Sequence, residues 1–256
     1  MALLEVNHVQ KIYKTRFGGN EVMALKDVHF TVEPGEFVAI MGESGSGKTT
    51  LLNIMAALDV PTMGSVSVDG KDMSKLSDSA RTLFRREHLG FIFQDFNLLD
   101  NFSLEDNILL PLVLAGEKYE KMQAKMQPIV KELGIAELIK KYPYEVSGGQ
   151  KQRAAVARSL ITNPKILLAD EPTGALDSKS STNLLRQLRE INQSGQTILM
   201  VTHSNVAASY ADRVMFIKDG EVFHQIYKGD MKRSEMLDKI CDAVTVLMRG
   251  GDESEQ

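Results

Sequence analysis

The chain has 256 residues, of which 43% are hydrophobic and 25% are charged, and its formal net charge is −4. This length and composition are those of an ordinary globular protein with one sizeable core, or a core with a subdomain. The small negative charge argues against a nucleic-acid-binding protein, whose surface is normally basic. The single cysteine, Cys241, excludes an internal disulfide framework and is typical of a reducing compartment, where we expect a buried, inert thiol in a C-terminal helix.

Two further patterns argue against a membrane-spanning or secreted chain. A membrane-spanning helix needs a run of about 18 apolar residues, and the longest candidate, Ile108–Ala115, is too short and contains Pro111. The start, Met1–Val6, lacks the basic region and the long apolar core of a signal peptide. We therefore expect neither a membrane span nor a signal peptide.

The N-terminal part predicts antiparallel strands. Residues 3–33 alternate apolar and polar side chains, and Gly18–Asn20 is typical of a turn between two strands. Ser65–Gly70 has the pattern of another strand of the same layer.

Residues 37–50 predict a phosphate-binding turn between a strand and a helix. Phe37–Met41 is a short apolar run typical of a buried strand, and Thr50–Leu58 predicts a helix. The turn fits the phosphate-loop pattern G-x-x-x-x-G-K-[ST], in which backbone N–H groups at a helix N-terminus meet phosphate oxygens. The residues expected to bind a nucleotide there are Gly42, Ser44, Gly45, Ser46, Gly47, Lys48, Thr49 and Thr50. The Lys48 ammonium can reach the β- and γ-phosphates, and the Thr49 hydroxyl can ligate Mg²⁺.

The middle of the chain predicts helices. Residues 96–145 are rich in helix formers and carry few strand signals. We interpret residues 95–145 as a helical subdomain inserted after Gln94. Downstream, Val146–Arg153 begins with Ser147, Gly148, Gly149 and Gln150 ahead of a predicted helix over residues 150–162. These four residues are expected either to cap that helix, since serine is a good N-cap, or to form a second anion-binding cradle.

A strand that ends in two carboxylates follows. Ile166–Ala169 is apolar, and Asp170 and Glu171 come directly after it. Ligands of open α/β sheets bind at the carboxyl ends of strands, so these side chains are expected in a site. Glu171 there would be a plausible general base, an effect of about 10²–10⁴-fold in rate.

The last part completes an α/β pattern. Between residues 146 and 220, helices alternate with short apolar strands, which predicts a parallel sheet. Val214–Val222 predicts a closing hairpin with an Asp-Gly turn, residues 231–249 predict an amphipathic helix, and Gly250–Gln256 predicts a frayed tail. The predicted fold class is α/β: a phosphate-loop NTPase with a RecA-like parallel sheet core, an antiparallel β layer and an inserted α-helical subdomain. We expect one domain over residues 1–256, with a catalytic core of residues 1–94 and 146–230.

The motifs together resemble those of the ATP-binding cassette (ABC) ATPases, whose signature is usually LSGGQ; here Val146 precedes Ser147 where leucine is commoner. The resemblance implies an ATPase that uses ATP and Mg²⁺ and acts as a head-to-tail homodimer, with Ser147–Gln150 of one copy serving the γ-phosphate held by the other. It implies metal contacts from Asp170 and Gln94.

The same resemblance implies further site residues. Glu171, Gln94 and His203 are expected in catalysis, and Asp177 in the D-loop that crosses the dimer interface. Tyr13 resembles the aromatic residue that stacks on adenine, with Phe17 as a nearby rival.

A narrower resemblance concerns the transporter class. Leu89–Asp100 and Ala169–Lys179 look like the macrolide-export and lipoprotein-release group, and Asn107–Leu112 and Val206–Tyr210 look like the bacitracin-export ATPases of Gram-positive bacteria. This implies resistance to, or sensing of, cell-wall-targeting antimicrobial peptides. It also implies an integral-membrane permease on a separate chain, a sensor histidine kinase reached through the permease, a peripheral location on the cytoplasmic face of the membrane, and no nucleic acid partner.

Other functions fit the sequence less well. Lipoprotein release and cell-division coupling are alternatives within transporters, and a soluble cassette ATPase acting on DNA or the ribosome is an alternative of another class. DNA-repair cassettes carry a long heptad insertion, whereas 52 residues without sustained heptads separate Gln94 from Ser147. Ribosome-acting cassettes resemble two fused copies, and this chain holds one. A phosphate-loop kinase would not explain Val146–Arg153.

One segment has two open interpretations. Asp95–Phe102 follows Gln94, and four of its eight residues are large and apolar without a clean helix or strand period. Phe96 and Leu98 are expected either to cover the core of the helical subdomain or to form a groove for a cytoplasmic helix of the permease.

Overall fold

The computed structural model describes residues 2–14 and 21–252, and side chains up to Leu247. The described strands are β1 (Leu4–Lys14), β2 (Glu21–Val32), β3 (Phe37–Met41), β4 (Met63–Val68), β5 (Lys71–Asp72), β6 (Leu89–Ile92), β7 (Ile166–Asp170), β8 (Thr197–Val201), β9 (Arg213–Lys218) and β10 (Glu221–Tyr227). The described α-helices are α1 (Lys48–Met55), α2 (Asp78–His88), α3 (Leu104–Leu114), α4 (Tyr119–Glu132), α5 (Gly148–Leu160), α6 (Ser178–Gln193), α7 (Asn205–Ala208) and α8 (Arg233–Asp252). Short 3₁₀ turns lie at Met73–Lys75, Ala136–Leu138 and Pro143–Glu145.

These strands form one sheet in the order β5-β4-β1-β2-β10-β9-β3-β8-β7-β6. Strands β3, β8, β7 and β6 are parallel neighbours, and β9 is parallel to β3. Their apolar residues are buried on both faces, as expected for a parallel sheet covered by helices. The predicted parallel core is therefore confirmed. In register, Ile40 and Asp170 both lie opposite Val201 of β8, so the carboxyl ends of these strands meet at one edge.

The antiparallel strands β1, β2, β4 and β5 continue the same sheet. Residue Glu221 of β10 pairs with Asp27 of β2, and β10 pairs with β9 in the predicted hairpin. Asp219 and Gly220 both have positive φ, at 50° and 77°, as a two-residue type I′ turn requires. The predicted Gly18–Asn20 turn lies outside the described residues.

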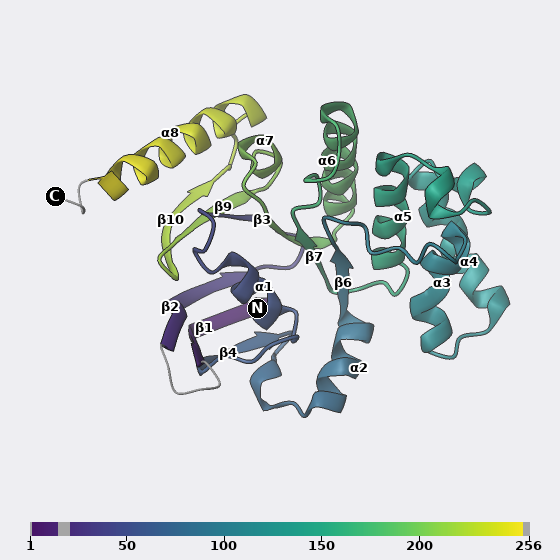
Figure 1. Cartoon of the computed structure of the whole chain (residues 1–256), viewed down its shortest axis with the longest axis horizontal. Coiled ribbons are helices and arrows are strands. Elements are labelled where there is room, and N and C mark those ends of the chain that lie inside the picture. The colour runs from purple at the N-terminus through teal and green to yellow at the C-terminus, as the bar shows by residue number, and fades with distance from the viewer. Residues whose placement is uncertain (1, 15–20, 253–256) are drawn as a thin grey trace.

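Two apolar clusters cover the two faces of the sheet. On one face, α1 lies between the parallel strands and the antiparallel part, and its Leu51, Ile54 and Met55 are buried there. The other face is covered by α5, α6 and α8, with Leu188 of α6 and Ile240 of α8 among the buried residues. Figure 1 shows α8 on one side of the molecule and α3, α4 and α5 on the opposite side.

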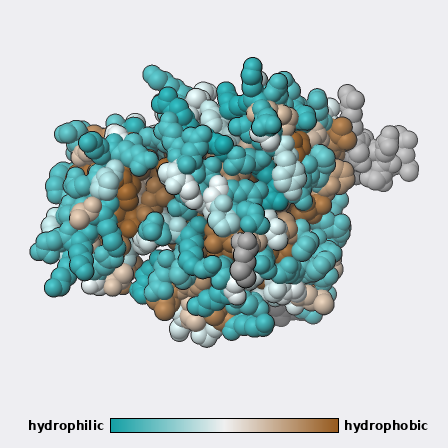
Figure 2. Space-filling model, turned by 180° about the vertical axis from the view of Figure 1, so that it is seen from behind, coloured by the Kyte–Doolittle hydropathy of each residue, from teal (hydrophilic) through white to brown (hydrophobic). Residues whose placement is uncertain are grey.

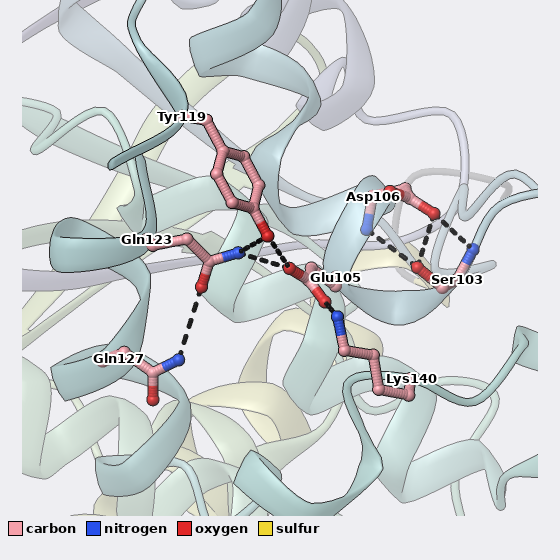
Figure 3. Close-up of polar contacts among 7 residues, drawn as sticks. All are labelled: Ser103, Glu105, Asp106, Tyr119, Gln123, Gln127 and Lys140. Atoms are coloured by element: carbon pink, nitrogen blue, oxygen red, sulfur yellow. Dashed lines mark hydrogen bonds and ion pairs between the residues drawn. The ribbon is translucent and has the colours of Figure 1, made fainter. Parts of the chain in front are cut away.

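We propose residues 95–145 as the helical subdomain, and its helices α3 and α4 pack against α5. A buried carboxylate joins its parts, as Figure 3 shows. Glu105 of α3 accepts hydrogen bonds from Tyr119 and Gln123 of α4, and Lys140 forms an ion pair with it. Burial acts to raise the pKa of Glu105, but the bonds from Lys140 and Gln123 outweigh it and hold the pKa below its ordinary value. The negative charge therefore stabilises the packing of α3 on α4.

The structure corrects several expectations from the sequence. Helix α1 begins at Lys48, two residues before the predicted start, and α5 begins at Gly148, because Gly47 and Ser147 are the N-caps. Helix α8 extends to Asp252, so residues 250–252 are helical, and the rest of the predicted frayed tail lies outside the described residues. Cys241 is exposed, since α8 buries Met236 and Ile240 while Cys241 lies on another face.

Candidate active site

The phosphate loop joins β3 to α1 at the edge where the parallel strands end. Gly47 has φ +102°, and a Cβ atom there would lie 2.5 Å from the carbonyl oxygen of Ala24 in β2. Only glycine fits this position without strain. Gly47 is also the N-cap of α1 and supplies no side-chain cap, so the N–H groups of the first turn are available to an anion.

The ammonium group of Lys48 is enclosed by the backbone of the phosphate loop. Lys48 Nζ donates to the carbonyl oxygens of Gly42 (2.7 Å) and Glu43 (2.6 Å), so the backbone wraps around the ammonium group. Burial lowers the pKa of Lys48, and the negative charges of Glu171 and Asp170 oppose this effect. The lysine therefore lies in the electric field of the two carboxylates at the end of β7.

Asp170 carries a charge that its surroundings do not favour. Burial raises the pKa of Asp170, the adjacent Glu171 raises it further, and Lys48 counteracts them. A divalent cation bound to Asp170 would stabilise its negative charge. Among the described residues no group of three His, Cys, Asp or Glu side chains could hold a metal by itself. Mg²⁺ usually binds to one or two carboxylates, water and substrate phosphates, so Asp170 with the Thr49 hydroxyl and the Gln94 amide oxygen is a fitting set of oxygen donors.

Glu171 is held in one orientation by the end of β8. Its Oε1 accepts a hydrogen bond from the His203 backbone N–H (2.9 Å) and lies 2.8 Å from His203 Nδ1. Its Oε2 accepts from the Thr202 hydroxyl (3.1 Å). Glu171 also has a positive φ of 46°, an uncommon conformation for a residue with a side chain that is often found at functional sites. The structure thus brings Glu171 and His203 into direct contact.

Thr202 is a further candidate site residue, and no sequence motif indicates it. It is fully buried, and its hydroxyl oxygen accepts from the Ser204 N–H while the hydroxyl donates to Glu171. The only signal in the sequence is a polar residue between the apolar strand β8 and His203.

The signature residues lie with the D-loop residue in a second group. Ser147 and Gln150 form a capping box, with Ser147 Oγ accepting from Gln150 N (3.3 Å) and Gln150 Oε1 accepting from Ser147 N (2.9 Å). Ser147 therefore caps α5, which is the alternative to the expected anion-binding cradle, and its hydroxyl hydrogen stays available for an anion. A Cβ atom on Gly149 would lie 2.9 Å from Ser180 Oγ, so glycine lets α5 approach the start of α6.

Asp177 is the N-cap of α6. Its Oδ1 accepts from the N–H groups of Lys179 and Ser180, at 2.9 Å each. The hydrogen bond from the Ser180 hydroxyl, together with these backbone bonds, holds the pKa of Asp177 below its ordinary value. Gln94 is exposed and lies against the same loop, because a Cβ atom on Gly174 would be 2.9 Å from Gln94 Nε2.

Tyr13 lies apart from both groups. Its hydroxyl donates to Asp59 Oδ2 (2.9 Å), and Lys11 Nζ is 4.9 Å from the ring centroid. Tyr13 is opposite Val22 in β2, the strand whose Ala24 abuts the phosphate loop. The ring is partly exposed, as an adenine-stacking residue must be. Its rival Phe17 lies outside the described residues.

The predicted residues thus fall into two groups within one chain. The first comprises the phosphate loop, Asp170, Glu171 and His203; the second comprises Ser147–Gln150 and Asp177. Among the described residues, no hydrogen bond or ion pair joins one group to the other. A cavity of about 470 Å³ lies beside the first group, between the phosphate loop and α8.

Comparisons with known proteins agree on one family. The family profile described as "ABC transporter" matches residues 25–174. The chain is 48% identical over 256 residues to the bacitracin export ATP-binding protein BceA of Halalkalibacterium halodurans, covering 100% of each chain. It is 41% identical over 237 residues to the macrolide export ATP-binding/permease protein MacB of Salmonella typhimurium, covering 93% of this chain and 36% of that one.

Solved structures show the same fold. A dimeric structure of a post-hydrolysis state of the ATP-binding cassette MJ0796, bound to ADP and Pi, has a TM-score of 0.79 and 38% sequence identity. The match covers 88% of this chain and 98% of that chain.

Proposed function

Because the chain belongs to the ATP-binding, ATP-hydrolysing subunits of ABC transporters, we propose that two copies form a head-to-tail dimer that drives a permease on a separate chain. The observation that carries this proposal is the division of the site into two groups within one chain. ATP held on the phosphate loop of one copy meets Ser147–Gln150 and Asp177 of the other. The dimeric structure of the similar cassette MJ0796 supports this arrangement.

Each residue has a defined task in this proposal. The phosphate loop and Lys48 bind the triphosphate, and Tyr13 stacks on adenine. Asp170, Thr49 and Gln94 would hold Mg²⁺, which would neutralise phosphate charge. Glu171 accepts the proton of the attacking water, and its bonds to His203 and Thr202 keep the carboxylate aimed at that water.

We propose that the transporter confers resistance to, or senses, cell-wall-targeting antimicrobial peptides. The support is the full-length likeness to a bacitracin export ATP-binding protein at 48% identity. The likeness to a macrolide exporter is weaker, and that protein carries its permease in the same chain. A sensor histidine kinase would act through the permease. Among residues 2–14 and 21–252 no helix is long and apolar enough to cross a membrane. We propose that the chain has a peripheral position on the cytoplasmic face of the membrane.

A complementation experiment tests this function. In a strain that lacks the gene, the wild-type chain should restore growth in bacitracin, and Lys48→Ala should not, because it removes the charge that binds phosphate. Immunoblotting controls for equal amounts of both chains. Restored tolerance to a macrolide, with none to bacitracin, would contradict the peptide proposal.

The permease requires a docking surface, and a groove of about 580 Å³ lies between the catalytic core and the helical subdomain. Figure 2, seen from behind, shows apolar surface gathered where these two parts meet. Leu58, Phe91 and Leu114 contribute apolar surface to the groove, and Arg85 and Arg86 contribute positive charge. We propose that it receives a short permease helix with apolar and acidic side chains, by charge complementarity.

The groove changes the expectation for Asp95–Phe102. Leu98 packs against the apolar cluster that α3 and α4 share with one face of the sheet, and Phe96 lies near Gly148. Only Asn97 of this segment lines the groove. Leu98 therefore covers the core, and the docking test moves to exposed groove residues.

Leu114→Gln is expected to weaken co-purification with the permease and to abolish bacitracin protection, while basal ATPase and melting temperature stay unchanged. Leu114 is 65% exposed in the free chain, so its loss removes little packing within the chain. Val113→Gln is the matched control, because Val113 is also exposed and does not line the groove. Equal loss of co-purification in both variants would contradict the docking assignment.

A further inference from the structure

Gln152 connects helix α5 to two loops of the candidate site. It lies on α5, five residues after Ser147, and is fully buried. Its Nε2 donates to the carbonyl oxygen of Pro172 (2.8 Å) and to that of Phe93 (3.2 Å). Pro172 directly follows Glu171, and Phe93 directly precedes Gln94.

The side chain is polar in a place where polarity is unfavourable. Gln152 Oε1 is buried and has no hydrogen-bond partner among the residues that the structure describes. A buried amide oxygen without a partner destabilises the folded state, so such groups in native proteins call for an explanation other than stability. The two hydrogen bonds of the amide nitrogen offer such an explanation, because they link α5 to two loops at the site.

The two loops that Gln152 contacts are packed closely against each other. A Cβ atom on Gly174 would lie 2.9 Å from the Gln94 side chain, so the loop after Glu171 touches the loop at Gln94. Helix α5 packs on α3 and α4 of the helical subdomain, next to the proposed permease groove. A displacement of α5 is therefore passed to the backbone on both sides of the site.

We propose that Gln152 is a positioning residue, which links the position of α5 to those of Glu171 and Gln94 and so makes hydrolysis depend on the placement of the helical subdomain. This inference rests on the proposed roles of Glu171 and Gln94. Gln152 touches neither nucleotide nor water in this scheme, and it acts through the backbone at Pro172 and Phe93.

Gln152→Met tests the proposal in the purified full-length chain. Methionine has a similar length and no N–H donor, so both bonds to the loops are lost. A small displacement of a catalytic group lowers turnover by on the order of 10²-fold, so kcat should fall by about that factor. The KM for ATP and the ATP affinity of the monomer should stay unchanged, because the phosphate loop is untouched.

Asn192→Leu is the matched control. Asn192 of α6 is also buried, and its Nδ2 donates to two backbone carbonyls, those of Gly35 (2.8 Å) and Gln196 (2.9 Å). These carbonyls precede β3 and β8, at the opposite ends of the strands from the site. This variant should lower the melting temperature as Gln152→Met does, and its kcat should remain that of the wild type.

The outcomes separate the inference from the proposed function. Wild-type kcat in Gln152→Met, or an equal fall of kcat in Asn192→Leu, would overturn the positioning role. If Glu171→Gln, assayed in parallel, keeps full turnover, the proposed chemistry itself is wrong. Should Gln152→Met not fold, Gln152→Leu also lacks the amide donor and adds no charge to the buried position, and the same comparison of kcat with Asn192→Leu tests the proposal.

Discussion

Glu171→Gln is expected to lose most ATP turnover, roughly 10²–10⁴-fold, while ATP binding is retained. Glutamine has the shape of glutamate, so its oxygen can still accept from the His203 N–H that now bonds Glu171 Oε1 at 2.9 Å. It cannot take a proton from water. The closed dimer should therefore accumulate with ATP, because its geometry persists and the hydrolysis that opens it does not occur.

Size-exclusion chromatography with ATP, together with phosphate release, measures this result. Glu190→Gln on α6 is the control, since Glu190 is an exposed carboxylate that forms an ion pair with Arg186. It should hydrolyse ATP at the wild-type rate and remain monomeric after turnover. Near-normal ATPase in Glu171→Gln would show that another group is the base.

Lys48→Ala and Ser147→Ala should separate the two halves of the shared site. Lys48→Ala should weaken ATP binding by the monomer by about tenfold to a hundredfold, since a hydrogen bond to a charged group contributes roughly 1.5–3 kcal/mol. Ser147→Ala should leave the affinity of the monomer unchanged and lower turnover, because its hydroxyl meets ATP held by the other copy. Equilibrium binding at protein concentrations too low for dimers, and ATPase at high concentrations, measure the two effects.

Ser147 also caps α5, so a control must account for lost stability, which is about 1 kcal/mol for such a cap. Ser103→Ala provides it, because Ser103 forms the same capping box at α3, accepting from Asp106 N at 3.1 Å. Both variants should melt at similarly reduced temperatures, and only Ser147→Ala should lose turnover. Equal loss of monomer affinity in Lys48→Ala and Ser147→Ala would refute a site shared by two copies.

Much of the fold was predictable because its signals are local. The run Phe37–Met41 becomes β3 because an all-apolar segment is stable only when both faces are covered. The turn at Asp219 and Gly220 becomes a hairpin because these residues tolerate positive φ. The phosphate loop was equally clear, since close backbone approach to phosphate requires glycine at fixed spacings.

The sequence by itself determined most of the strands, the hairpin, the phosphate loop and the family. The tertiary structure decided how distant residues meet. Thr202 bonds Glu171, and Gln152 bonds the carbonyls beside Glu171 and Gln94, across elements far apart in the chain. Cys241 is exposed because the rotation of α8 follows from what it packs against, which the periodicity of one helix does not specify. Local backbone preferences act over a few neighbouring residues, whereas side-chain contacts between elements form only when the whole sheet and its helices are assembled.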